Sequence, residues 1–172
     1  WESQNTGDFL AVGAVTTGGR YVNEATGTLR KTTNGSTNVL NIMVTVFENE
    51  GTVDSQAGTI TFSNTSFHTD ATFIVASGAA VDIAAASTFA GTSTGSPDGL
   101  LRIRAVTQAA IAGATWALGG TGLEWNNGYL TAGTVTNTGL VRLNGGGGSR
   151  GVNADGAVFR NEGTVTWTDT SP

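Results

Sequence analysis

One seven-residue segment occurs twice in this chain and constrains the fold more than any other feature. Phe47–Val53 reads FENEGTV and Phe159–Val165 reads FRNEGTV, so the two copies differ at one position. Val135–Val141 is a looser copy, and Val22–Leu29 is a fourth with two extra residues between Asn and Gly. An apolar residue, Asn, Gly and then a β-branched or aliphatic residue predict a strand, a turn and a second strand. The recurrence of this unit is typical of a stacked β architecture.

The spacing of the glycines at these turns predicts the size of the repeat. Glycines at 27, 51, 78, 99, 122, 139 and 163 are separated by 17 to 27 residues, mostly in the low twenties. One coil of a solenoid has this length. We therefore predict an all-β fold, a parallel β-helix (β-solenoid) with coils of about 20–24 residues. The alternative is an antiparallel β-sandwich, which also uses short strands and glycine turns.

The whole chain, 1–172, is expected to form one solenoid domain, with an irregular part at 1–20 and a linker-like end at 168–172. The region 63–112 departs from the repeat pattern. Ala79–Thr88 and Ala105–Ala114 could be helical, with a short helical turn around Thr107–Ile111. Ala90–Gly99 and Gly145–Ala154 are expected to be projecting loops. Because the chain starts at Trp1, we expect a removed leader or a longer parent protein.

The repeated turns are expected to stack into a structural ladder. Asn at a tight turn can adopt the left-handed conformation and bond to its neighbour in the next coil. Gly permits the positive φ that such a corner would need. Val53, Val141 and Val165 should then point inward. The ladder residues are Asn23, Asn49, Asn137 and Asn161, with Gly27, Gly51, Gly139 and Gly163.

Composition excludes several classes of partner. The net charge is −5, the pI is near 4.6, and only 12% of residues are charged. Nucleic acid and anionic lipid both require a basic surface, so neither is an expected partner. There is no cysteine, so disulfide bonds cannot form. No apolar run is long enough to span a membrane as a helix, so membrane insertion is not expected.

At Val22–Phe62 and Gly122–Trp167 the chain resembles the Asn/Gly/Thr-rich β-solenoid repeats of large bacterial surface and secreted proteins. The resemblance implies right-handed parallel β-helix modules of the kind found in adhesins, autotransporter passengers and surface stalks. It implies an extracellular or cell-surface location. It supplies no catalytic residue set that could be transferred to this chain.

The residues that carry chemistry are scattered. Glu48 and Glu50 lie on the side of the chain opposite Asn49, and the other carboxylates share no repeat phase. His68, the only histidine, is interpreted as a loop residue rather than part of a catalytic triad. Zinc is excluded, and no cofactor is expected beyond an adventitious calcium ion at Asn153–Gly156 or Pro97–Gly99. The glycine run at 145–148 lacks the lysine of a phosphate loop.

The aromatic residues of the last third allow two interpretations. Trp116, Trp125 and Tyr129 on an exposed β face would suit stacking on sugar rings or contact with a protein. The same rings turned inward would serve packing alone, which is the interpretation we favour. Flat ranks of threonine at constant spacing would suit ice binding, but the variable coil length disfavours it.

Three functions follow, in order of preference. The first is a non-enzymatic extracellular structural module, acting as a stalk, an adhesin segment or a filament subunit. The second is a domain that binds a polysaccharide or a surface receptor through Trp116, Trp125 and Tyr129. The third is a polysaccharide-degrading enzyme. Because neither end offers a polar cap, we expect the coil ends to associate with other copies or with neighbouring modules.

Overall fold

The computed structural model describes residues 2–3, 19–32, 39–104, 107–144, 150–152 and 156–167. The irregular region expected at 1–20, the glycine loop expected at 145–154 and the linker expected at 168–172 fall wholly or mostly outside these residues. The described residues form strands and contain no helix. In chain order the strands are β1 Glu2–Ser3, β2 Arg20–Asn23, β3 Thr28–Lys31, β4 Val39–Ile42, β5 Val46–Asn49, β6 Thr52–Ser55, β7 Thr59–Phe62, β8 Ser66–Thr69, β9 Thr72–Val75, β10 Ala80–Ile83, β11 Ser87–Gly95, β12 Leu100–Ile103, β13 Thr107–Leu118, β14 Leu123–Trp125, β15 Gly128–Leu130, β16 Thr134–Asn137, β17 Leu140–Leu143, β18 Arg150–Val152, β19 Val158–Asn161 and β20 Thr164–Trp167.

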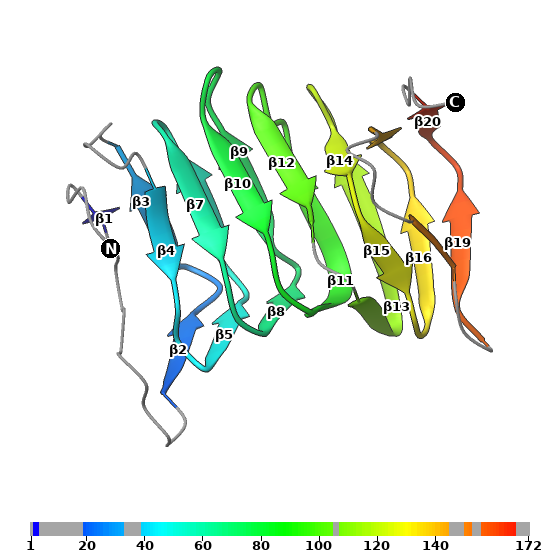
Figure 1. Cartoon of the computed structure of the whole chain (residues 1–172), viewed down its shortest axis with the longest axis horizontal. Coiled ribbons are helices and arrows are strands. Elements are labelled where there is room, and N and C mark those ends of the chain that lie inside the picture. The colour runs from blue at the N-terminus through cyan, green and yellow to red at the C-terminus, as the bar shows by residue number, and fades with distance from the viewer. Residues whose placement is uncertain are drawn as a thin grey trace.

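The strands wind into a parallel β-solenoid. One sheet has seven strands in the order β20-β17-β14-β12-β10-β7-β4, and consecutive members lie one coil apart, which gives about six coils. A second sheet has 13 strands and forms the rest of the wall. Figure 1 shows the coils following one another along the longest axis, from blue to red. Every strand pairing is parallel, which confirms the predicted fold class and excludes the antiparallel sandwich.

Two apolar columns from the seven-stranded sheet run through the interior. Alternate residues of a strand point to opposite faces, so a constant register places like positions of successive coils on top of one another. The first column is Leu40, Ile60, Val81, Leu101, Leu123, Val141 and Val165. The second is Ile42, Phe62, Ile83, Ile103, Trp125, Leu143 and Trp167. Val53 and Val141 are fully buried and Val165 is half-buried against the core, as predicted.

Aromatic rings form a second continuous feature of the core. Successive ring centroids lie 4.7 to 6.0 Å apart, within the range of favourable aromatic pairs. The rings come from coils along most of the axis, and the series passes from Trp125 directly to Phe159. In order they are Tyr21, Phe47, Phe62, His68, Phe89, Trp116, Trp125 and Phe159.

The region 63–112 is stacked regularly where it is described, although its sequence departs from the repeat pattern. The helical segments predicted at Ala79–Thr88 and at Ala105–Ala114, with its turn around Thr107–Ile111, are wrong, because β10 and β13 run through them. The loop predicted at Ala90–Gly99 is also wrong over most of its length, since β11 extends to Gly95. A register shift between Phe89 and Gly91 bends the strand around a corner without ending it. Inward aliphatic residues determine the stacking here, not the Asn–Gly turn.

Candidate functional site

The first Asn–Gly corner joins β5 to β6 within the 13-stranded sheet. Asn23 and Asn49 are paired in register and buried at this corner. The side-chain amide of Asn23 donates through Nδ2 to Asn49 Oδ1 at 2.7 Å and to the Thr52 carbonyl at 3.1 Å. Both acceptors belong to the next coil. The amide therefore joins successive coils, as the sequence predicts for a ladder.

The second Asn–Gly corner repeats this hydrogen-bond pattern near the other end of the chain. Asn137 donates through Nδ2 to Asn161 Oδ1 at 2.8 Å and to the Thr164 carbonyl at 3.1 Å. This corner, however, connects β16 of the 13-stranded sheet to β17 of the seven-stranded sheet. The same heptapeptide thus makes two different corners of the solenoid.

The strand β13 shows how far apart these two corners are. Asn49 is in register with His68, then with Phe89 and with Ala110 of β13. Asn137 is in register with Trp116, six residues further along the same strand. The glycines that were assigned to one common position therefore belong to two corners, with Gly27 and Gly51 at the first and Gly139 and Gly163 at the second.

The corner glycines are required for a reason that differs from the predicted one. None of these four glycines has a positive φ, and among the described non-glycine residues only Asp70 does. A Cβ at Gly51 would instead collide with the carbonyl oxygens of Glu24 and Gly27 in the preceding coil. A Cβ at Gly163 would collide with the backbone of Gly139. Close approach between coils, rather than a left-handed conformation, selects glycine here.

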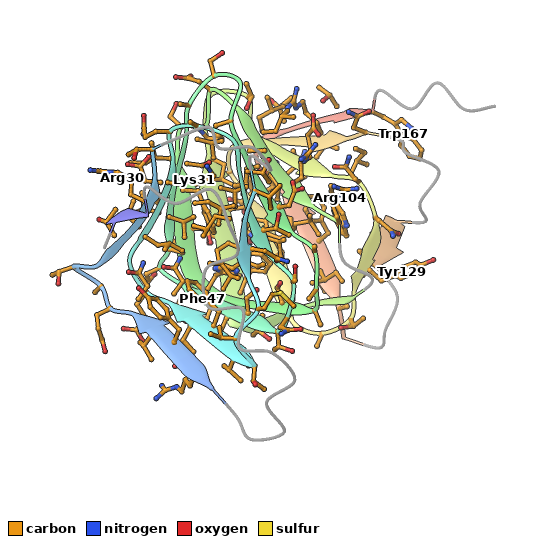
Figure 2. The ribbon with its side chains drawn as sticks, turned by 60° about the vertical axis from the view of Figure 1, so that its left-hand side comes forward. Arg30, Lys31, Phe47, Arg104, Tyr129 and Trp167 are labelled. Atoms are coloured by element: carbon orange, nitrogen blue, oxygen red, sulfur yellow. The ribbon has the colours of Figure 1, made fainter. Side chains whose placement is uncertain are left out.

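The aromatic residues proposed as ligand contacts lie mainly in the core. Trp116 and Trp125 are buried, with ring centroids 6.0 Å apart in an edge-to-face arrangement. Neither ring offers a face to a ligand, because both occupy inward positions of their strands. Tyr129 is half-buried on the outer side of β15, between buried Gly128 and Leu130, and Figure 2 shows it at the side of the fold. An exposed aromatic row made of these three residues is therefore not present.

His68 is an interior residue and not a loop residue. It lies on β8, is 1% exposed and stacks on Phe89 at 5.3 Å. Its Nε2 lies 3.1 Å from Ser66 Oγ, and that hydroxyl lies 2.9 Å from Ser87 Oγ of the next coil. Burial lowers the pKa of His68 to about 3, so the ring is neutral at physiological pH. The cluster is a core polar network that joins two coils.

A charge ladder runs along the outer face of the seven-stranded sheet. Asp82, Arg102, Glu124 and Arg142 occupy the same register position in four successive coils. Arg102 donates to the two oxygens of Asp82 at 2.5 and 2.9 Å. Arg142 Nη2 lies 3.0 Å from Glu124 Oε1 but makes no hydrogen bond of acceptable angle, so this contact is an ion pair only.

A repeated triplet in the sequence, apolar–polar–apolar, predicts this ladder, although the Asn–Gly motif does not. Each member is the middle residue of a triplet whose outer residues point inward, as in Val81-Asp82-Ile83 and Leu101-Arg102-Ile103. Such triplets recur once per coil throughout the seven-stranded sheet. Their alignment, rather than the Asn–Gly turn, would identify the register of every coil.

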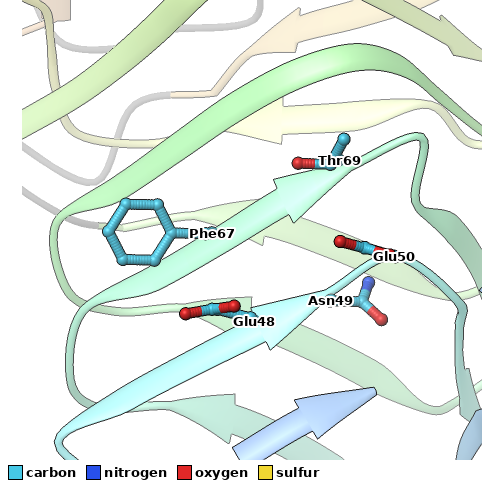
Figure 3. A pocket seen from close by; sticks show the side chains of 5 residues that line it. All are labelled: Glu48, Asn49, Glu50, Phe67 and Thr69. Atoms are coloured by element: carbon cyan, nitrogen blue, oxygen red, sulfur yellow. The ribbon is translucent and has the colours of Figure 1, made fainter. Parts of the chain in front are cut away.

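Two recesses on the described surface are lined by side chains that could contact a ligand. One, of about 220 Å³, is lined by Glu48, Asn49, Glu50, Phe67 and Thr69, and Figure 3 shows the ring of Phe67 near Glu48, with Glu50 toward Thr69. The Arg20 guanidinium hydrogen-bonds to Glu48 and lowers the pKa of that carboxyl. The other recess, of about 410 Å³, lies beside the charge ladder and includes Asp98, Arg102, Thr121 and Arg142.

Among the described residues no group of three or more His, Asp or Glu side chains is placed to hold a metal ion. The described part of the chain also has no helix of the length and apolarity needed to cross a membrane. Comparison with protein-family models, with curated proteins and with solved structures finds no match. The structure confirms the β-solenoid fold that the resemblance to bacterial surface repeats implies.

Proposed function

We propose that this chain is a non-enzymatic structural module of an extracellular or cell-surface protein. It would act as a rigid segment of a stalk or adhesin, in contact with neighbouring modules at its coil ends. No cofactor takes part in this proposal. The proposal is based on the contacts that polar side chains make between successive coils, because the comparisons with known proteins give no match.

The observation that carries the proposal is that polar side chains bind one coil to the next instead of converging on one point. Asn23 donates to Asn49, Arg102 to Asp82, and Asn137 to Asn161, and in each pair the partners lie in successive coils. The two apolar columns run in the same direction through the interior. An array in which each unit contacts its neighbours is suited to bearing load along its axis.

Pulling the chain between its two ends in a single-molecule force experiment tests this proposal. We expect stepwise unfolding, in which each step releases one coil, about 20 residues or roughly 7 nm of extended chain. Asp82→Asn should lower the force of one step, and the exposed Glu162→Gln is the matched control. Unfolding in one event at low force would contradict the proposal, as would cleavage of a polysaccharide by the intact chain.

The recess beside Phe67 supports a second candidate, binding of a carbohydrate. Phe67 is half-buried on the outer side of β8 and lines one recess together with Glu48, Glu50 and Thr69. The apolar face of a sugar can stack on such a ring, while hydroxyl groups hydrogen-bond to the carboxylates. This site replaces Trp116 and Trp125, whose rings are buried.

A glycan array followed by titration calorimetry distinguishes this candidate. We expect Phe67→Ala to abolish any binding found with the wild-type chain, while Ile74→Ala on the next strand leaves it unchanged. Ile74 is a suitable control because it is an exposed apolar residue outside the recess. Binding that survives Phe67→Ala would place the ligand elsewhere.

A further inference from the structure

The larger recess crosses several coils on the outer face of the seven-stranded sheet. Thr59, Ala80 and Leu100 share one register position on β7, β10 and β12, and all three line the recess. Arg102 and Arg142 line it from the next outward position, two coils apart. Figure 1 shows β7, β10, β12 and β14 side by side in this order. Because neighbouring strands lie about 4.8 Å apart, the lining extends roughly 19 Å along the solenoid axis from β7 to β17.

The backbone keeps this recess free of large side chains. Gly78 has a φ of +79°, a left-handed conformation that favours glycine, and a Cβ there would meet no atom within 4 Å. A Cβ at Gly99 would lie 2.2 Å from the carbonyl oxygen of Ala76 and 2.4 Å from that of Ala79. Both positions therefore require glycine, and Ala79 and Ala80 add two more small residues to the lining. The volume of about 410 Å³ falls within the range of roughly 300–1,000 Å³ that is usual for ligand sites.

The charge ladder beside the recess presents guanidinium groups to the solvent more than carboxylates. The side chains of Asp82 and Glu124 are 6% and 7% exposed, whereas those of Arg102 and Arg142 are 23% and 28% exposed. Arg104 also pairs with Asp82. Three arginines thus face two carboxylates, and the net charge of these five side chains is +1, although the whole chain carries −5. This face can therefore attract an anion that the rest of the chain would repel.

Both arginines of the recess keep N–H donors for a further acceptor. Arg102 uses Nε and Nη2 on Asp82, which leaves Nη1. Arg142 makes no hydrogen bond through Nε or Nη2, although both atoms are buried. Its contact with Glu124 is an ion pair only, so turning the Arg142 side chain toward the recess breaks no hydrogen bond with a described residue. Asp98, the exposed carboxylate of the recess, has no side-chain partner in the described part of the chain.

We propose that this recess binds an acidic polysaccharide, whose chain runs along the solenoid axis. Uronate carboxylates of the ligand pair with Arg102 and Arg142, because a guanidinium group presents a planar pair of donors that matches a carboxylate. The two arginines belong to strands two coils, or roughly 10 Å, apart, so each takes a different sugar unit of one chain. Sugar hydroxyls donate to Asp98, which an acidic peptide, with one backbone N–H per residue, serves less well. This inference goes beyond the structural function and does not depend on it.

Titration calorimetry with a defined acidic oligosaccharide, hexagalacturonate, tests this site. We expect saturable binding that weakens as salt is added, because the contacts join opposite charges. The methyl ester of the same oligosaccharide has no carboxylates and should bind at least about tenfold more weakly. Arg142→Gln combined with Glu124→Gln removes the cation without leaving a buried carboxylate unpaired, and should weaken binding by about tenfold. The matched control is Arg160→Gln combined with Glu162→Gln, which removes an exposed ion pair outside the recess and should leave binding unchanged.

Four results would overturn the proposal. They are no binding of hexagalacturonate, equal binding of its methyl ester, equal binding of a glutamate hexapeptide, and equal weakening by the two double variants. Circular dichroism shows whether each variant keeps the β fold. Arg142→Lys, which keeps the charge but loses the planar pair of donors, is a second variant and should also weaken binding. A chain that unfolds coil by coil under force without binding the oligosaccharide would retain the structural function and reject this site alone.

Discussion

The first and last coils place residues in the same two inward columns, yet only one of them buries those residues. Leu40 and Ile42 begin the columns and are essentially inaccessible, whereas Val165 is half-buried and Trp167 is largely exposed at the other end. Trp167 has the larger apolar surface and therefore the larger potential gain from burial. Chemistry of the side chain does not explain the difference.

The difference shows that burial in a solenoid comes from neighbouring coils. An inward residue of an inner coil contacts coils on both sides, whereas one in an open terminal coil contacts a single coil. Stability should therefore be unevenly distributed along the axis, high in the closed part and low in the last coil. The four predictions below test this comparison, from the largest expected effect to the smallest.

Leu40→Asp and Val165→Asp compare the two ends of one column. Leu40→Asp places an unpaired charge in the closed interior and should lower the free energy of unfolding by about 4 kcal/mol or more. Val165→Asp should cost only about 1–2 kcal/mol, because its carboxylate can reach water at the open end. Urea denaturation of both variants gives the two values. Equal losses would show that the last coil is as closed as the first.

Acid should destabilise the closed part through His68. The pKa of this histidine is about 3 in the folded chain against an ordinary value of 6.5, so only the unfolded chain takes up the proton in between. Stability is unaffected above pH 6.5 and falls as the pH drops toward 3. At pH 4 the loss is about 3 kcal/mol, since each pKa unit corresponds to about 1.4 kcal/mol.

A control variant separates the contribution of His68 to the acid sensitivity from the contribution of the carboxylates. His68→Phe keeps an aromatic ring in the stack and should remove this part of the acid sensitivity. Glu162→Gln in the last coil should retain it. Denaturation curves at pH 7 and pH 4 for the three chains provide the comparison, and identical pH dependence in all of them would place the histidine outside the folded core.

The two amide ladders should differ in strength. Asn23→Ala removes a buried donor from Asn49 Oδ1 and the Thr52 carbonyl, and should cost about 2 kcal/mol. Asn161→Ala removes an exposed acceptor of the last coil and should cost less than about 1 kcal/mol. Thermal unfolding measures both. A larger loss of stability for Asn161→Ala than for Asn23→Ala would show that the last coil is held more strongly than the first, contrary to the prediction.

The ion pairs should show the smallest difference. Asp82 is buried between Arg102 and Arg104, so Asp82→Asn should cost about 1–2 kcal/mol. Glu162 lies 3.9 Å from Arg160 with both side chains exposed, and Glu162→Gln should change stability by less than about 0.5 kcal/mol. Repeating the measurement at high salt should reduce the second effect further.

Several features of the fold could be predicted from the sequence because they are local or repeated. The Asn–Gly–Thr segments predict turns, the apolar residues around them predict strands, and their spacing predicts a parallel stack of coils. The inward placement of Val53 and Val141 follows from the same pattern. Each of these predictions needs only the two-residue period of a strand and the conformational demands of a turn.

The tertiary structure decided what depends on register between distant coils. Partners one coil apart are 18 residues apart at Leu123 and Val141 but 26 apart at Asn23 and Asn49, so one motif can occupy two corners. The same variable coil length hides the ladder of Asp82 and Arg102. His68 and Trp116 became core residues because alternation along a strand defines two faces but does not say which one is inside. That choice is made by the coils above and below, through the burial of apolar area that they share.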